Sequence, residues 1–183
     1  MELRKEVGYT YADYLTWDND VRQELIDGVI YDMATPSRRH QAISFELGRQ
    51  VGNYLRGKPC RAYAAPFSVR LNADSFDDTV VEPDLVVVCD MSKLDDKGCV
   101  GAPDFVVEIL SPSTASKDKV LKYRAYLNAG VREYWIVDPD AQTVHAHVLE
   151  NGKYDVTIYH ENDIAPIQVL EGCEIDLTEV FAE

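Results

Sequence analysis

The chain has 183 residues, of which 46% are hydrophobic and 27% charged, and its formal net charge is −14. These values are typical of a soluble globular protein with a proper core, and we expect a single domain over residues 1–183. Residues 1–15 lack the apolar segment of a signal peptide, and the longest apolar runs, such as residues 85–89, are too short to span a bilayer. The sequence therefore excludes a membrane-spanning chain and predicts a cytoplasmic protein.

The four cysteines, Cys60, Cys89, Cys99 and Cys173, are widely spaced and form no Cys-x-x-Cys pair. This pattern is typical of free thiols in a reducing compartment and argues against a structural zinc site. We therefore expect all four side chains to be free thiols.

The charge is distributed unevenly along the chain. Residues 36–70 contain seven Lys or Arg residues and one acid, Glu46, whereas the segment from Asp138 onward contains eleven acids and one base, Lys153. The net charge argues against a nucleic-acid partner, but a basic face could still bind phosphates while the acidic remainder limits nonspecific adhesion. The alternative is that these charges only form solvated faces.

The first third of the chain predicts two helices separated by a hairpin. Residues 10–17 indicate a short helix with Thr10 as its N-cap. Residues 23–33 are two apolar-rich runs around Asp27-Gly28, a dipeptide suited to a type I′ hairpin turn. Residues 37–57 have apolar side chains at helical spacing, and they predict a helix that Ser37 begins and Gly57 ends.

The middle of the chain predicts strands. Residues 61–71 alternate between apolar and polar side chains, and residues 83–90 form a continuous apolar run typical of a central strand. The acidic stretch 72–79 between them predicts a loop. Residues 104–110 form the next apolar run, which predicts a further strand.

The last third predicts a loop and helix over residues 111–130, ended by Gly130, and then a strand over 132–138. Residues 143–149 and 153–160 alternate about Asn151-Gly152, which predicts a second hairpin. The tail 175–181 is either a short strand or a terminal helix. This order of elements predicts an α/β or α+β domain, with a central mixed sheet flanked by helices and an added β-hairpin.

Two of the predicted strands carry acids, Asp84 in "EPDLVVV" and Glu108 in "PDFVVEIL". An ionised carboxylate within an apolar strand is costly to bury unless a cation compensates it. If the two strands are neighbours, Asp84 and Glu108 can converge and bind a hard cation such as Mg²⁺. The alternative is that Asp84 caps a turn and Glu108 faces solvent.

The helix after Glu108 adds a cation to this pattern. Asp118, Lys122 and Tyr126 are spaced four residues apart and share one helix face, from which Lys122 could reach the acids. A lysine there could orient an attacking water and offset charge that builds up on a phosphate. Alternatively, Asp118 and Lys122 form an ordinary surface pair. Glu24 is a third acid within an apolar pattern, and it could instead face solvent.

Five motifs together resemble one known family: "ELIDG", "EPDLVVV", "PDFVVEILSPST", the Asp118-x₃-Lys122-x₃-Tyr126 helix and "AGVREYWIVDP". From about residue 10 to the C-terminal end, the chain resembles the Uma-type restriction endonuclease family of the PD-(D/E)xK nuclease superfamily. The pair "EILSPST" and "GVREYWIVDP" is specific to this resemblance, whereas "PD" alone is common.

The resemblance implies a restriction-endonuclease-like core and a site for Mg²⁺ or Mn²⁺. Asp84 and Glu108 would be the metal-binding acids of the motif, and the backbone carbonyl of Ile109 would complete the metal site. The superfamily motif places a lysine two residues after the glutamate, but position 110 is Leu. The resemblance suggests that this role has moved to Lys122, and that Glu24 assists metal binding.

The leading hypothesis is a metal-dependent endonuclease that hydrolyses DNA phosphodiester bonds, with Asp84, Glu108, Lys122 and Glu24 as catalytic residues. The alternatives are a DNA-binding or protein-interaction module of the same fold with little or no cleavage, and a small-molecule hydrolase with the same metal site. The apolar strands and aromatic residues also make a homodimer plausible.

Several further residues have both a functional and a structural interpretation. Candidates for contacting DNA phosphates are basic residues of the two helices, Arg38, Arg39, Arg49, Lys117 and Lys119. His40 either lies among these substrate-binding residues or has a structural role. Ser113 or Thr114 is expected to cap the following helix rather than to act as a nucleophile, because the chain has no Gly-x-Ser-x-Gly motif. Tyr134 and Trp135 are expected in the core or an interface.

Overall fold

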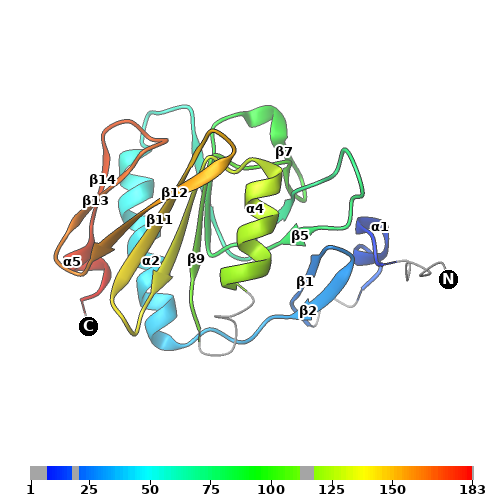
Figure 1. The fold of residues 1–183 in the computed structure, drawn as a ribbon, viewed down its shortest axis with the longest axis horizontal. Helices are drawn as coiled ribbons and strands as arrows, with labels where there is room; N and C mark the ends of the chain where they lie inside the picture. The colour runs from blue at the N-terminus through cyan, green and yellow to red at the C-terminus, as the bar shows by residue number, and fades with distance from the viewer. Residues whose placement is uncertain (1–7, 18–20, 112–117, 183) are drawn as a thin grey trace.

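A computed structural model describes residues 8–17, 21–111 and 118–182. In these residues, most strands belong to two mixed six-stranded sheets (Figure 1). The first sheet contains, in spatial order, β2 (Val29–Asp32), β1 (Gln23–Ile26), β5 (Val80–Val81), β4 (Ser68–Arg70), β8 (Gly98–Val100) and β7 (Leu94–Asp95). The second contains β12 (Lys153–His160), β11 (Thr143–Glu150), β10 (Glu133–Asp138), β9 (Phe105–Ile109), β6 (Leu85–Val88) and β3 (Arg61–Ala64).

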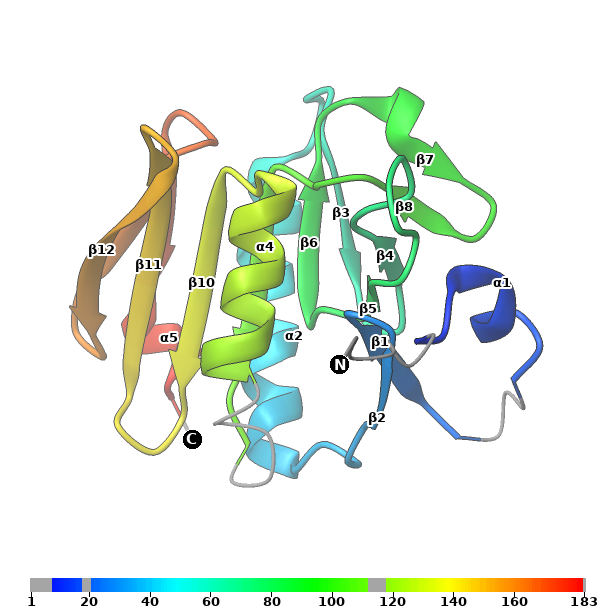
Figure 2. The same ribbon diagram turned by 45° about the vertical axis from the view of Figure 1, so that its right-hand side comes forward.

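Helices cover both faces of the second sheet. Figure 2 shows α2 (Arg38–Tyr54) on one face and α4 (Tyr123–Ala129) on the other. The remaining elements are α1 (Tyr11–Tyr14), the 3₁₀ turn η1 (Met91–Lys93), the π-helical turn η2 (Asp118–Lys122), the pair β13 (Ile164–Ile167) and β14 (Cys173–Asp176), and α5 (Leu177–Val180). The predicted mixed sheet flanked by helices is therefore confirmed.

The alternation of side chains along β9 explains how one sheet serves two cores. Phe105, Val107 and Ile109 belong to the core beneath α2, whereas Val106 points into the other core, which α4 and the first sheet share. All five residues of β9 are buried, including Glu108. The carboxylate of Glu108 therefore lies inside the protein and does not face solvent.

The local signals predicted most element boundaries to within a few residues. Ser37 caps α2 by accepting the His40 backbone N–H, and Gly130 ends α4 with a φ of 84°. Both predicted hairpins are present, β1–β2 and β11–β12, and their turn residues have positive φ, as a type I′ turn requires. The predicted cap at Ser113 or Thr114 lies outside the described residues.

The prediction of one continuous strand over residues 61–71 is wrong. β3 and β4 belong to different sheets and are separated by the Ala65–Pro66 segment. Proline has no N–H to donate to a strand ladder, so the chain leaves one sheet there and enters the other. The short strands β5, β7, β8 and β13 were not predicted, because two to four residues carry too little periodicity to be recognised.

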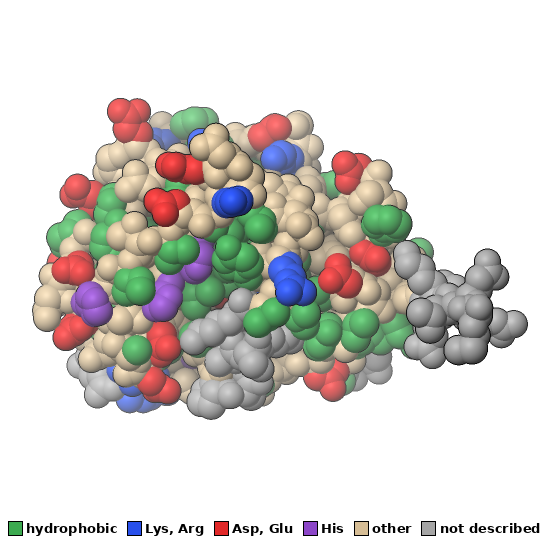
Figure 3. All heavy atoms as spheres, viewed as in Figure 1, with side chains coloured by type: hydrophobic (Ala, Val, Ile, Leu, Met, Phe, Trp, Pro, Cys, Tyr) green, Lys and Arg blue, Asp and Glu red, His purple; other side chains and the backbone are tan. Residues whose placement is uncertain are grey.

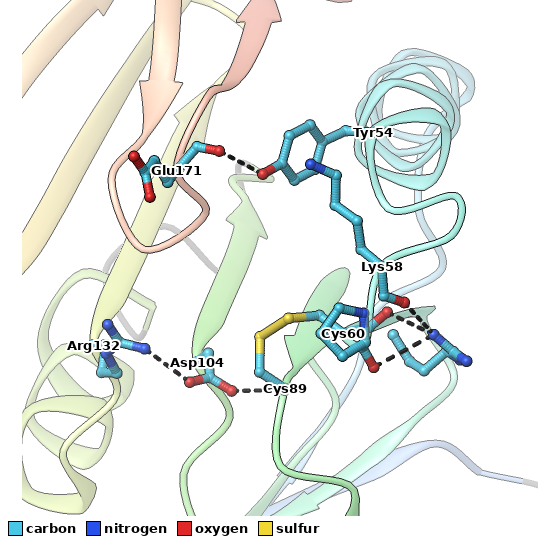
Figure 4. Close-up of a disulfide and its surroundings, with 9 residues drawn as sticks. Tyr54, Lys58, Cys60, Cys89, Asp104, Arg132 and Glu171 are labelled. Carbon is cyan, nitrogen blue, oxygen red and sulfur yellow. Dashed lines mark hydrogen bonds and ion pairs between the residues drawn. A yellow bond between two sulfur atoms is a disulfide. The ribbon is translucent and has the colours of Figure 1, made fainter.

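The prediction of four free thiols is also wrong. Cys60 and Cys89 form a disulfide (Figure 4). β3 and β6 are antiparallel, with Arg61 opposite Val88. Cys60, just before Arg61, therefore lies opposite Cys89, just after Val88. Their separation of 29 residues hides this adjacency in the sequence. Cys99 and Cys173 are free and buried. The predicted cytoplasmic location depended in part on four free thiols, so the disulfide removes that support. The location stays a prediction.

Among the helices of the described residues, none combines the length and the hydrophobicity needed to cross a membrane.

Candidate metal-binding and catalytic site

Two strands that each follow a Pro-Asp pair form the centre of the site. β6 follows Pro83-Asp84, and β9 follows Pro103-Asp104. The two strands are antiparallel, with Leu85 opposite Val107, so each aspartate lies at the far end of the other strand. Asp84 Oδ2 accepts the Ile109 backbone N–H at 2.8 Å. The same register, continued by one residue, sets Asp84 opposite Glu108.

Asp104 makes the equivalent contact at the other end of this strand pair. Its Oδ2 accepts the Cys89 backbone N–H at 2.7 Å, and its Oδ1 lies 3.1 Å from Arg132 Nη1 (Figure 4). The two aspartates therefore have matching structural roles. Only Asp84 lies at the end of the sheet where Glu108 is found.

A buried lysine joins two of the predicted acids. Lys122 Nζ lies 2.9 Å from Glu108 Oε1 and 2.7 Å from Glu24 Oε1. The residue is only 2% exposed, and both glutamates are buried. The hairpin β1–β2, strand β9 and the turn η2 each contribute one member, so residues nearly a hundred positions apart meet here. The sequence left open whether Lys122 faces the acids, and in the structure it lies against both of them.

Glu24 and Tyr126 hold this group in place. Glu24 Oε1 also accepts the Glu82 backbone N–H at 2.9 Å, which ties the hairpin to the segment just before Asp84. Tyr126, one helical turn after Lys122, donates its hydroxyl to Glu108 Oε1 at 2.5 Å. Burial, and then the negative charge of Glu108, raise the pKa of Tyr126 well above its usual value. The phenol therefore stays protonated and remains a donor at all physiological pH values.

The acids line the wall of a cavity of about 580 Å³. Its lining comes from the hairpin β1–β2, one face of α2, strand β3 and the ends of β6 and β9. These elements meet at the end of the sheet where α2 begins, at the lower side of Figure 2. Asp84, Glu108, Ile109, Lys122 and Glu24 all line it. The predicted catalytic and metal-binding residues are therefore brought together in one cavity.

The predicted substrate-binding residues are less closely grouped. His40 lines the cavity, and its Nε2 lies 3.2 Å from Asp84 Oδ2, while its buried Nδ1 has no hydrogen-bond partner in the described part of the chain. Arg38 and Arg39 line a separate small cavity beside α5, and Arg39 Nη1 lies 3.8 Å from Asp140 Oδ1.

The remaining phosphate-binding candidates are also paired or not described. Arg49 lines the main cavity but is held by Glu46 and Glu179, each at 2.5 Å. Lys117 lies outside the described residues, as does the side chain of Lys119. Contacts of these basic residues with phosphates stay predictions.

The donor set suits a hard divalent cation. Within the described ranges, no three His, Cys, Asp or Glu side chains are arranged to hold a metal ion by themselves. Mg²⁺ does not require such a set, because it binds through one or two carboxylates and keeps several waters. The Asp84 side chain is 17% exposed, Glu108 lies opposite it in the strand pair, and Ile109, whose N–H it accepts, also lines the cavity. These oxygen donors therefore fit Mg²⁺ or Mn²⁺.

Sequence reasoning missed three residues of this cavity. Glu82 and Arg22 both line the cavity and form an ion pair, with 2.8 Å between Glu82 Oε2 and Arg22 Nη2. Phe45 also lines the cavity and is 76% exposed. The only available signal was the exposed position of Phe45 on α2, opposite the apolar positions Ile43 and Leu47 that face the core.

Known proteins resemble this chain over most of its length. Two uncharacterized proteins of the cyanobacterium Synechocystis, slr1290 and sll1609, are 29% and 26% identical to it. The matches cover 82% and 70% of this chain, and 73% and 74% of those proteins. A crystal structure of a protein from Anabaena variabilis, titled a putative nuclease belonging to DUF820, has the same fold with a TM-score of 0.77. It is 20% identical, and the match covers 94% of this chain and 97% of that one.

A family match also covers most of the chain. Residues 11–178 match the Uma2 family, which is described as "Putative restriction endonuclease". This range includes the hairpin with Glu24, both Pro-Asp strands and the helix with Lys122. The chain therefore belongs to the Uma2 family of restriction-endonuclease-like proteins.

Proposed function

We propose that this protein is a metal-dependent endonuclease of the PD-(D/E)xK type that hydrolyses DNA phosphodiester bonds. The observation that carries the proposal is the position of Lys122, whose ammonium group lies against Glu108 and Glu24 in the cavity that Asp84 also lines. Burying a lysine and two acids has a desolvation cost, and clusters of charged groups in clefts are often found at catalytic sites. The family description supports the same reaction class.

In the proposed mechanism, Asp84, Glu108 and the Ile109 carbonyl are the groups that would hold Mg²⁺ or Mn²⁺ at the cavity wall. When bound, the cation would lower the pKa of a coordinated water and neutralise charge on the phosphate. Lys122 donates hydrogen bonds towards the attacking water or a phosphate oxygen, and so stabilises the developing charge. Glu24 keeps the lysine ammonium in place, and Tyr126 keeps Glu108 Oε1 oriented.

One observation favours a second candidate function, a binding module with little or no cleavage. The three Lys and Arg side chains that line the cavity, Arg22, Arg49 and Lys122, are all paired with carboxylates. Without a bound cation, such a cavity offers little attraction to a phosphate. The two functions differ in whether cleavage depends on a metal held by Asp84.

A plasmid-cleavage assay with matched aspartate variants distinguishes the two. Supercoiled plasmid and single-stranded DNA are incubated with the wild-type protein, Asp84→Asn and Asp104→Asn, each in Mg²⁺, Mn²⁺ or EDTA. Both substitutions remove a carboxylate that accepts a backbone N–H at the end of a strand, so they perturb the fold similarly. We expect metal-dependent cleavage by the wild type and by Asp104→Asn, and at least roughly 100-fold less by Asp84→Asn. No cleavage by the wild type, or equal cleavage by both variants, contradicts the proposal.

A further inference from the structure

We propose that the groove beside the acids binds an unpaired nucleobase stacked on Phe45, so that the substrate of this site is single-stranded or locally unpaired DNA. The inference rests on the proposed function, because it names the substrate class of the same cavity. It concerns base recognition, which neither the metal site nor the lysine provides.

Phe45 has the placement of a stacking residue. Its side chain lines the cavity and is 76% exposed, although the neighbouring α2 residues Ile43 and Leu47 are almost fully buried. An exposed aromatic ring in a groove offers a flat apolar surface to a ligand. Single-stranded nucleic acids are commonly bound by bases that stack on such rings, because every base has a π-face.

The surface next to Phe45 leaves room for a flat ligand. Gly48 and Gly52 follow on the same side of α2, and a Cβ placed on either would have no other group within 4 Å apart from its own helix and neighbours. Ala62 and Ala64, from the edge strand β3, line the groove with equally short side chains. The cavity of about 580 Å³ is within the range that holds a small organic ligand. The groove is therefore a wide apolar shelf that continues into the acid cluster.

The charges around the groove argue against a duplex held by its phosphates. Four carboxylates line the cavity, from Glu24, Glu82, Asp84 and Glu108, against three Lys or Arg side chains, and each of these cations is already paired. Figure 3 looks onto the other side of the molecule, where α4 lies in front of the sheet and α2 behind it, and there too the basic side chains are few and separated among many acids. Proteins that bind duplex DNA obtain much of their affinity from phosphate contacts. Here the binding energy must come mainly from bases, whose faces are accessible only when they are unpaired.

Binding of neutral-backbone oligonucleotides tests this inference without cleavage. The probe is a fluorescent oligothymidylate with methylphosphonate linkages, compared with the ordinary phosphodiester strand and with a duplex, by fluorescence anisotropy in EDTA and in Mg²⁺. We expect the neutral single strand to bind in EDTA, with a dissociation constant that changes little with salt. The dissociation constant of the duplex should be at least roughly tenfold higher than that of the neutral single strand.

Three variants separate stacking from an effect on folding. Phe45→Ala should weaken binding of the neutral strand roughly 5- to 100-fold, which corresponds to the loss of one stacked base. Phe76→Ala is the matched control, because Phe76 is 73% exposed but lies in the loop after β4, away from this cavity. Gly48→Leu should also weaken binding, because the new side chain fills the shelf, while thermal stability stays equal or rises.

The inference is overturned if the neutral strand does not bind, if Phe45→Ala binds like Phe76→Ala, or if the duplex binds as tightly as the single strand. It is also overturned if Phe45→Ala changes only self-association of the protein. These failures are distinguishable from failure of the proposed function, since cleavage of duplex plasmid that requires Asp84 would then still stand.

Discussion

Replacement of Lys122 by methionine tests the buried ion cluster. Methionine keeps the length of the side chain but leaves Glu24 and Glu108 without the cation that contacts both. Because Lys122 is 2% exposed and both acids are buried, solvent compensates little of this loss. Removing one partner of a buried ion pair costs about 3–5 kcal/mol, so we expect the free energy of unfolding to fall by about that amount at neutral pH.

Urea denaturation followed by circular dichroism, in EDTA, measures this effect. Lys153→Met is the control, because Lys153 is an exposed residue of β12, and its substitution should change stability by less than about 0.5 kcal/mol. Adding Glu24→Gln to Lys122→Met should restore part of the loss, since one uncompensated carboxylate is then removed. If Lys122→Met costs less than about 1 kcal/mol with an unchanged m-value, the buried cluster is not formed in the folded protein.

Three further predictions concern other parts of the fold. Tyr126→Phe removes the hydroxyl that donates to Glu108, so we expect the free energy of unfolding in urea to fall by about 1.5–3 kcal/mol. We also expect a lower kcat with little change in KM, and an unchanged kcat refutes the positioning role. Burial raises the pKa of Glu133 in the folded state, so the folded state binds more protons than the unfolded state. The stability of the wild type relative to Glu133→Gln should therefore increase as the pH falls from 7 towards the unfolded pKa, and a flat difference between the two stability curves contradicts this. Finally, the double substitution Cys60→Ser and Cys89→Ser should lower the free energy of unfolding of the oxidised protein by about 2–4 kcal/mol. Cys99→Ser is the control: it leaves the disulfide intact, so it should not cause the loss of stability that a reducing agent causes in the wild type.

Local sequence signals predicted the elements that position the site. Apolar periodicity and the cap at Ser37 define α2, and the turn dipeptide Asp27-Gly28 defines the hairpin that carries Glu24. The four-residue spacing of Lys122 and Tyr126 places both on the helix face that meets Glu108. These features are encoded within short segments, which explains why they can be predicted without the tertiary structure.

Features that depend on which strands are neighbours could not be predicted in the same way. Pro-Asp occurs twice, at Asp84 and Asp104, and only the antiparallel register decides which aspartate lies beside Glu108. The disulfide between Cys60 and Cys89 follows from the pairing of β3 with β6.

The effect of the uneven charge distribution also depends on which segments pack together. The basic segment and the acidic end of the chain are separate in sequence, but α2 packs against α5, and Arg49 pairs with Glu179 at 2.5 Å. Part of the predicted basic surface is therefore neutralised within the protein. A phosphate-binding face cannot be inferred from the count of arginines in this segment alone.

The most direct measurement is the anomalous scattering of Mn²⁺ in crystals of the wild-type protein and of Glu108→Gln. We expect a peak in the wild type within coordination distance of the carboxylates of Asp84 and Glu108 and of the Ile109 carbonyl oxygen, and a weaker or absent peak in Glu108→Gln. A wild-type crystal that has no peak at this position at saturating Mn²⁺, or that binds the ion only elsewhere, would contradict the metal-dependent mechanism.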